Sequence, residues 1–342
     1  MPVNFYILTF KRKIVLSFIL ILINLIIFDI SLDFIANLKT TKTTFINNKF
    51  SKIRHLQLNN PHNKDIIFMG SSKTLYHVST NIFRKNNINI YNLGISGAQF
   101  EDYPAFMPYL KTIKPKKIVI SLPVISLYWK LEIAKYPTQE ELKYYYDIDK
   151  VKFLQSSEQW IVNRHLFLQY SEPIFYKIKS VYRKFDVKNK FKQQDNNQSL
   201  ITKPLDYSEL VDCNVFDIKH TSDIKTTLKC SNGDGAIIGN HVKPKERRGL
   251  KHLKKLNPQS IKYLQKMISS LTENNIEVSI ILEPMLHNNY EYKLDEIKQA
   301  FGKTEIIDLT NFNIKDEFWS DNSHLNYKGR EKYSKYLLTI LK

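Results

Sequence analysis

The sequence has few cysteines and few glycines for a chain of 342 residues. Its two cysteines, Cys213 and Cys230, show no metal-ligand spacing, so we expect no metal site and no cofactor. In an exported domain the pair could form one disulfide, whereas in a cytosolic protein both would remain free thiols. The nine glycines accompany abundant Lys, Ile and Asn, a compositional bias that indicates little about function.

The sequence also lacks zinc-finger spacing, an RNP-like aromatic motif and an internal repeat. Its formal net charge is nevertheless +18. Such a charge attracts anionic partners, although lysines spread over a solvated surface would produce the same total. Because no nucleic-acid motif is present, we expect no nucleic-acid partner and favour an anionic membrane surface or an anionic glycan.

A basic cluster at residues 11–13 precedes an apolar run from Ile14 to Phe28 that contains only two polar residues. A membrane-spanning helix needs about 20 apolar residues, and basic flanks remain on the cytoplasmic side. We therefore predict that residues 1–37 form an uncleaved, single-pass signal anchor in the cell membrane, with a cytoplasmic N-terminus and an extracytoplasmic remainder. A cleaved signal peptide and a buried soluble helix remain as alternatives.

The rest of the chain alternates between predicted strands and helices, the pattern of a parallel sheet with covering helices. We predict a linker at residues 38–61 and an α/β domain at residues 62–130 and 256–342. The expected strands are residues 65–69, 88–93, 117–122, 276–282 and 304–309. The expected helices follow Ser72 and occupy residues 103–114, 261–274 and 327–341.

Residues 131–255 interrupt this alternation, because they are rich in Tyr, Lys, Asn and Asp and lack clear strand signals. We interpret them as a large insertion that lies over the sheet. The alternative is a separate helical subdomain that does not contact the site.

Three short motifs lie where predicted strands end or in the loops that follow. Gly70-Ser71-Ser72 joins a strand to a helix, where a serine nucleophile would have free backbone N–H groups beside it. In Asp321-Asn322-Ser323-His324, the carboxylate can bond Nδ1–H of the imidazole while Nε2 faces outward. The glycine block 92–97 can offer an unhindered N–H to an oxyanion.

Each motif alone is also typical of ordinary helix caps and turns. Their conjunction is more informative, since ligands of open α/β sheets bind at the carboxyl ends of the strands. We therefore expect the three motifs, although distant in the chain, to meet at that edge.

Together these residues resemble the SGNH/GDSL hydrolase superfamily, in its membrane-anchored branch with Gly-Ser-Ser in place of Gly-Asp-Ser. The resemblance covers residues 62–130 and 256–342, and it implies a flavodoxin-like three-layer α/β/α fold. It also implies that Ser72 is the nucleophile, His324 the general base and Asp321 its orienting carboxylate. The oxyanion would be held by the N–H groups of Ser72 and Gly94.

One departure from the family concerns the Asn that commonly follows its third strand. Here that stretch, residues 121–126, contains no Asn, so either Ser121 or Ser126 replaces it or the oxyanion has two donors. Three further residues are candidates to line the substrate pocket: Ser71, Ser121 and His287. For His287 the alternative is a position in a surface loop. Asp308, after the last strand, is expected to be a structural carboxylate.

The branch includes proteins that acylate cell-surface polymers. The resemblance thus implies a membrane-anchored serine esterase or O-acyltransferase that acts on cell-surface glycans through an acyl-serine. It also implies a multi-span membrane protein that delivers the acyl group. A secreted carboxylesterase for small or lipid esters and a non-catalytic binding module are the alternatives.

Overall fold

The computed structural model divides the chain into one unit of residues 1–41 and 155–202 and another of residues 42–154 and 203–342. Among the residues with a described structure, no helix is long and apolar enough to span a membrane. Most of the predicted anchor, the linker and residues 145–205 lie outside the described set. That set comprises residues 14–21, 23–24, 27, 49, 52–53, 55–56, 64–132, 138, 140–141, 144, 206–222, 225–240, 242 and 250–341.

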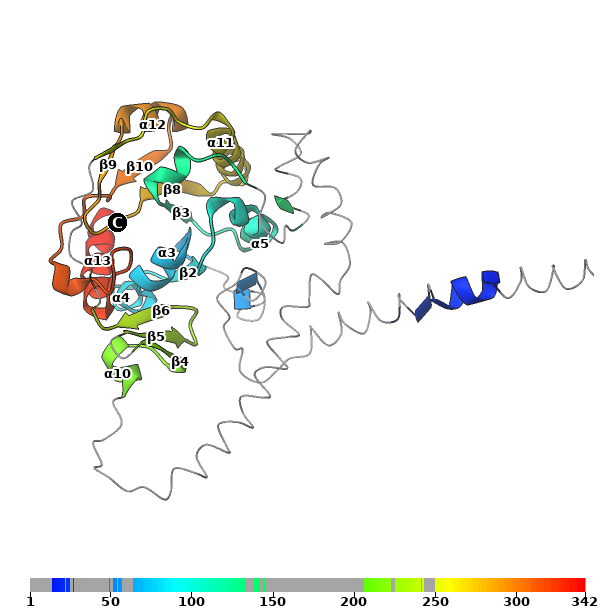
Figure 1. The fold of residues 1–342 in the computed structure, drawn as a ribbon, viewed down its shortest axis with the longest axis horizontal. Coiled ribbons are helices and arrows are strands. Elements are labelled where there is room, and N and C mark those ends of the chain that lie inside the picture. The colour runs from blue at the N-terminus through cyan, green and yellow to red at the C-terminus, as the bar shows by residue number, and fades with distance from the viewer. Residues whose placement is uncertain are drawn as a thin grey trace, which may run out of the picture. The chain divides into compact units, whose positions relative to one another are not determined.

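A five-stranded, fully parallel sheet forms the centre of the second unit (Figure 1). Numbered along the chain, its strands follow the order 2-1-3-4-5, which is that of flavodoxin-like sheets. Each strand lies within two residues of its predicted bounds, because strands buried on both faces are nearly continuous apolar runs. They are β1 (Ile66–Gly70), β2 (Ile90–Gly94), β3 (Lys117–Leu122), β8 (Glu277–Leu282) and β10 (Glu305–Asp308).

Helices cover both faces of this sheet and create two separate cores. Ile67 and Met69 of β1 belong to the core shared with α5 (Met107–Ile113), α11 (Pro258–Thr272) and α12 (Leu294–Phe301). The alternate residues Ile66 and Phe68 belong to the core shared with α4 (Thr80–Arg84) and α13 (Tyr327–Ile340). The alternation of side chains along a strand thus produces three layers, as the sequence predicts.

Two predicted helices are interrupted in the structure. The helix after β1 ends early as α3 (Ser72–His77), because Val78 is extended, and α4 begins two residues later. The expected helix at 103–114 consists of a 3₁₀ segment, η1 (Phe100–Phe106), followed by α5. Pro104 lies inside η1 and Pro108 in the first turn of α5, and neither has the N–H that a continuous α-helix across this stretch would need, which explains the break.

The prediction that residues 131–255 lack strands is wrong for residues 206–240. This stretch forms α10 (Tyr207–Val211) and an antiparallel sheet of β4 (Val215–Ser222), β5 (Lys225–Cys230) and β6 (Gly235–Ile238). β4 and β5 are only partly buried and contain many polar residues, whereas the short β6 is buried at three of its four residues. The sheet lies beside the α/β core, with β6 against α3 and α13 (Figure 1).

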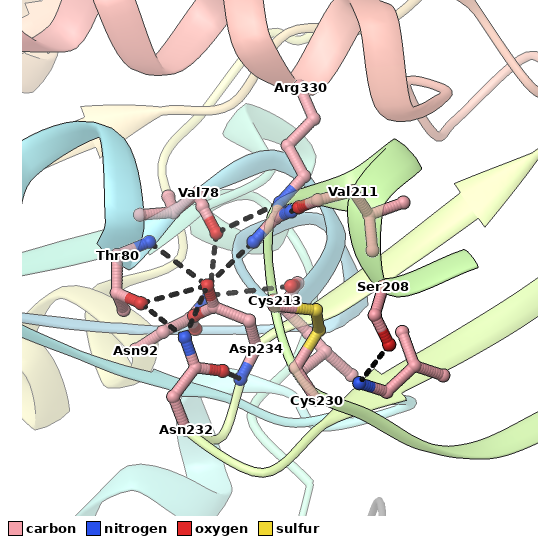
Figure 2. The surroundings of a disulfide bond; sticks show 12 residues. Val78, Thr80, Asn92, Ser208, Val211, Cys213, Cys230, Asn232, Asp234 and Arg330 are labelled. Atoms are coloured by element: carbon pink, nitrogen blue, oxygen red, sulfur yellow. Dashed lines mark hydrogen bonds and ion pairs between the residues drawn. A yellow bond between two sulfur atoms is a disulfide. The ribbon is translucent and has the colours of Figure 1, made fainter. Parts of the chain in front are cut away.

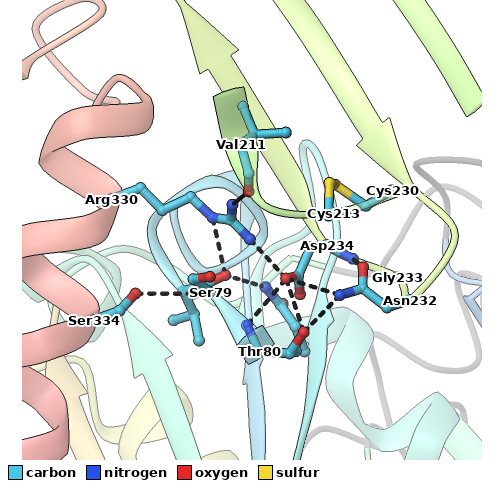
Figure 3. Close-up of polar contacts among 12 residues, drawn as sticks. Ser79, Thr80, Val211, Cys213, Cys230, Asn232, Gly233, Asp234, Arg330 and Ser334 are labelled. Carbon is cyan, nitrogen blue, oxygen red and sulfur yellow. Dashed lines mark hydrogen bonds and ion pairs between the residues drawn. A yellow bond between two sulfur atoms is a disulfide. The ribbon is translucent and has the colours of Figure 1, made fainter. Parts of the chain in front are cut away.

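Two features fix this antiparallel sheet. A disulfide joins Cys213 to Cys230, with a Cα–Cα distance of 5.8 Å (Figure 2). The buried carboxylate of Asp234, just before β6, accepts hydrogen bonds from Arg330 of α13 (2.6 Å) and from the Thr80 backbone N–H at the start of α4 (3.0 Å), as Figure 3 shows. The sheet is therefore anchored to two elements of the α/β core.

The remaining short elements lie at the periphery of the second unit. Strands β7 (Lys251–His252) and β9 (Tyr290–Glu291) form a two-stranded parallel pair. Two 3₁₀ segments follow β3 and β10, respectively, and the second leads into the loop before α13. They are η2 (Val124–Leu127) and η3 (Asp316–Phe318).

Candidate active site

Ser72 is the first residue of α3 and lies two residues beyond the end of β1. The preceding Ser71 caps the helix by accepting a hydrogen bond from the Lys73 N–H at 3.2 Å. Gly70 makes the sharp entry possible, since a Cβ there would lie 1.9 Å from Thr74 Oγ1 and 2.9 Å from the Ser121 carbonyl oxygen. Within the described residues the Ser72 N–H has no hydrogen-bond partner, as expected at a helix start.

His324 lies in the loop between η3 and α13, and this loop is tightly constrained. The Ser320 N–H donates to the His324 carbonyl oxygen at 2.7 Å, and Trp319 forms an antiparallel bridge with Leu325. Asn326 ends the loop by capping α13, accepting from the N–H groups of the second and third helical residues at 3.1 Å each. The imidazole is thereby brought to Ser72, with Nε2 2.9 Å from Oγ.

Asp321 orients this imidazole from the other side. Nδ1 of His324 lies 3.0 Å from Oδ1 and 3.1 Å from Oδ2. Oδ1 also accepts the backbone N–H groups of Ser323 and His324, both at 2.8 Å. Burial would raise the pKa of Asp321, but the hydrogen bonds from the His324 ring, the Lys225 ammonium and the Ser323 backbone N–H hold that pKa well below its ordinary value.

The structure therefore brings together three predicted residues, although Ser72 and His324 are 252 positions apart in the chain. A carboxylate next to Nδ1 fixes the tautomer with the proton on Nδ1, which leaves Nε2 to accept the serine proton. This is the arrangement required of a nucleophile, a general base and its orienting group.

The expected oxyanion donor Gly94 is engaged elsewhere in the structure. Its N–H donates to Oδ1 of the buried Asn92 at 2.9 Å, and Asn92 Nδ2 donates in turn to three backbone carbonyl oxygens at the end of α3. Gly97 has a left-handed φ of 78°, and its N–H has no partner in the described part of the chain. The glycine block thus presents Gly97, and not Gly94, as a free donor.

The hydroxyls of Ser71 and Ser121 contact a buried carboxylate, that of Glu283 immediately after β8. Ser71 Oγ lies 3.4 Å from both carboxylate oxygens, Thr74 Oγ1 donates to Oε1 at 3.2 Å, and the Ser121 hydroxyl also hydrogen-bonds this group. Burial raises the pKa of Glu283, and the nearby Lys73 ammonium opposes this. Both serines are therefore occupied in a network that supports the turn around Ser72.

Three other predicted residues lie in local contacts. His287 Nε2 is 3.8 Å from Asp316 Oδ2, and no contact with Ser72 or His324 is found among the described residues. Ser126 lies in η2, with its N–H bonded to the Pro123 carbonyl oxygen at 3.0 Å. Asp308 accepts hydrogen bonds from the Thr310 N–H and hydroxyl and from a tyrosine hydroxyl, which is the expected structural role.

Two residues that contact the relay were not predicted from the sequence. His77, fully buried at the end of α3, accepts the Leu325 N–H at Nε2 (3.0 Å), immediately after His324. Burial and the nearby charge of His324 lower its pKa well below the ordinary value, so it is neutral. Lys225 of β5 places Nζ 2.5 Å from Asp321 Oδ2. Because His77 follows Ser72 by five residues, the sequence could have indicated that it lies near the site. Nothing in the sequence near Lys225 indicates a contact with Asp321.

Among the residues that the structure describes, no group of three or more His, Cys, Asp or Glu side chains is arranged to hold a metal ion. No protein-family model matches the sequence, and no curated protein matches it either. The fold is similar to the crystal structure of a proposed acylhydrolase from Bacteroides fragilis, with 11% sequence identity and a TM-score of 0.34. The similarity covers 86% of this chain and 99% of the other.

Proposed function

We propose that this chain is a serine esterase or O-acyltransferase of the SGNH type. One observation carries the proposal: Ser72 Oγ lies 2.9 Å from His324 Nε2, and the other nitrogen of the same ring faces the Asp321 carboxylate. Such an arrangement activates a serine hydroxyl at neutral pH.

In the proposed reaction, Ser72 Oγ attacks the carbonyl carbon of an ester while its proton moves to His324 Nε2. The tetrahedral intermediate collapses, the bond to the leaving alcohol breaks, and His324 returns the proton to that alcohol. Water or a sugar hydroxyl then attacks the acyl-serine and loses its proton to His324. Release of the acid or the acylated sugar restores Ser72 and neutral His324.

The intermediate oxyanion needs hydrogen-bond donors that are free in the resting protein. Among the residues that the structure describes, neither the Ser72 N–H nor the Gly97 N–H has a hydrogen-bond partner, so both meet this condition. Ile95, two residues before Gly97, donates its N–H to the Gly70 carbonyl oxygen at 3.0 Å, which keeps the glycine loop beside the turn that carries Ser72. We therefore propose Ser72 and Gly97 as the donor pair, in place of Ser72 and Gly94.

The proposed setting is the outer face of the cell membrane, with residues 1–37 as a single-pass anchor and a cytoplasmic N-terminus. The basic cluster before the apolar run supports this orientation. The Cys213–Cys230 disulfide supports it independently, because such bonds persist in oxidising compartments. By the resemblance to the SGNH branch described above, we further propose that cell-surface glycans accept the acyl group and that a multi-span membrane protein delivers it.

Hydrolysis of p-nitrophenyl acetate by the full chain tests the chemistry. Ser72→Ala and His324→Ala are expected to reduce kcat to the background rate, and Asp321→Asn to reduce it by about 10⁴-fold because the tautomer is wrong. The products are then analysed after an oligosaccharide has been added to the reaction. Formation of acetylated oligosaccharide would establish acyl transfer, and formation of acetate alone would indicate a carboxylesterase. Wild-type protein that is folded but no faster than Ser72→Ala would support the non-catalytic alternative.

A further inference from the structure

The outer oxygen of the Asp321 carboxylate has a partner from outside the α/β core. Lys225, the first residue of β5, places Nζ 2.5 Å from Asp321 Oδ2, although the two residues are 96 positions apart. The side chains are 22% and 25% exposed, so the pair is partly shielded from solvent.

Lys225 completes the hydrogen bonding of this carboxylate. Oδ1 is held by two backbone N–H groups of its own loop, and the imidazole faces both oxygens. Among the residues that the structure describes, the hydrogen-bond partners of Oδ2 are that imidazole and the Lys225 ammonium. The lysine thus opposes rotation of the carboxylate away from the plane in which it meets His324.

The charge of Lys225 also acts on the imidazole. A carboxylate beside Nδ1 favours the imidazolium form, and an ammonium on the same carboxylate offsets part of that effect. Lys225 therefore reduces the net negative charge that the Asp321 carboxylate presents to the imidazole.

The strand that carries Lys225 is anchored at its other end. Its strand ends at Cys230, which is joined to Cys213, and the next strand begins at Gly235, beside the buried Asp234–Arg330 ion pair. Figure 2 shows the disulfide and this ion pair on neighbouring segments. The antiparallel sheet can thus hold an ammonium at a fixed place against the loop that carries the relay.

We propose that Lys225 is a positioning residue for the Ser72–His324–Asp321 relay, so that the antiparallel sheet of β4, β5 and β6 forms part of the active site. This inference rests on the proposed esterase function for its catalytic meaning. The geometry that carries it is independent of the substrate.

The same strand offers a matched control. Lys229 lies four residues further along β5 and forms an ion pair with Asp217 at 2.6 Å, with side chains 18% and 33% exposed. Lys229→Met therefore removes an equivalent charge and an equivalent ion pair from the same sheet without touching the relay. Lys225→Arg retains the charge, and Lys225→Gln is a second neutral variant should Lys225→Met fail to fold.

The test is the NMR signal of the His324 Nδ1 proton in the isotopically labelled full chain at neutral pH, assigned through His324→Gln. Lys225→Met is expected to shift this signal, because the carboxylate that faces Nδ1 loses the partner of its second oxygen. Lys229→Met should leave the signal unchanged, and Lys225→Arg should restore it. An unchanged signal in folded Lys225→Met and Lys225→Gln would overturn the inference.

Kinetics distinguish this inference from the proposed function. The kcat for p-nitrophenyl acetate should fall in Lys225→Met, stay unchanged in Lys229→Met and recover in Lys225→Arg. A shifted His324 signal in a protein without esterase activity would uphold the contact and refute the proposed function. Esterase activity that depends on Ser72, with an unchanged signal in Lys225→Met, would refute the role of Lys225 and leave the function intact.

Discussion

His77 and Leu325 are joined by a hydrogen bond in which the Leu325 backbone N–H donates to Nε2 of the imidazole over 3.0 Å. The bond connects the end of α3, the helix that begins with Ser72, to the residue that follows His324. Because Nε2 accepts this hydrogen bond, His77 must remain neutral. The contact therefore ties the helix that begins with Ser72 to the loop that carries His324, and so helps to fix the distance between the nucleophile and its base.

Replacing His77 by Phe should weaken both stability and activity. The change leaves the buried Leu325 N–H without an acceptor, which costs about 1–3 kcal/mol. We expect a matching loss in urea unfolding and a lower kcat for p-nitrophenyl acetate. His77→Gln, which can offer an acceptor oxygen, should lose less of both, and equal behaviour of the two variants would argue against the hydrogen bond.

Substitutions at the two glycines after β2 should have different effects. A Cβ on Gly94 would lie 2.2 Å from Leu75 N and 2.6 Å from Leu75 Cα, so Gly94→Ala must displace α3 and should cost about 1–3 kcal/mol. A Cβ on Gly97 meets open space, and only its positive φ opposes Gly97→Ala, at about 1–2 kcal/mol.

Activity separates these glycines further. If the Gly97 N–H binds the oxyanion, strain at this residue should lower kcat beyond the fraction of protein that unfolds. Unfolding curves and kcat measured on the same samples provide the check. Because alanine retains the backbone N–H, full kcat in folded Gly97→Ala would contradict the predicted effect of strain at this residue.

The disulfide should stabilise the chain through loop closure. Cys213 and Cys230 are 17 positions apart, and a loop of this size corresponds to about 3 kcal/mol. We expect the double variant Cys213→Ser/Cys230→Ser to lose about that much in denaturant unfolding, and reduced wild type to behave alike. Identical stability of the oxidised and reduced protein would contradict the pairing.

His55 should make the protein less stable in acid. Burial, together with the positive charge of Lys52, lowers the pKa of His55 to about 4. In the unfolded chain His55 has its ordinary pKa of 6.5. Between about pH 6.5 and pH 4 the unfolded chain therefore binds a proton at His55 that the folded chain does not bind. Stability is full above about pH 6.5 and falls as the pH approaches 4, by up to about 3 kcal/mol.

The control for this prediction is His55→Gln. Glu101 and Glu141, whose pKa values burial raises to about 7, titrate with the opposite sign over the same range. The relevant quantity is thus the difference between wild type and variant in urea unfolding from about pH 7 to about pH 4.5. A difference that does not change with pH would contradict the account of His55.

The five parallel strands could be predicted from the sequence because both faces of each are buried, so that each is an apolar run. Ser72, His324 and Asp321 could be selected because short motifs mark the carboxyl ends of such strands. The strands β4 to β6 could not be found in this way, since β5 reads Lys-Thr-Thr-Leu-Lys-Cys and buries only part of its surface.

The choice between Gly94 and Gly97 depends on a tertiary contact. The sequence marks both glycines, but only the packing of the Asn92 side chain against α3 shows which N–H is occupied. Lys225 was missed for a related reason, because its partner Asp321 belongs to another sheet's loop and no local pattern connects them.

The most direct test of the Ser72–His324–Asp321 relay is covalent labelling of the full chain with a fluorophosphonate, followed by mass spectrometry of the adduct. The relay predicts one modified residue, Ser72, and loss of the adduct in His324→Ala while that variant remains folded. An adduct on another residue, or a wild-type protein that stays unlabelled while folded, would contradict it.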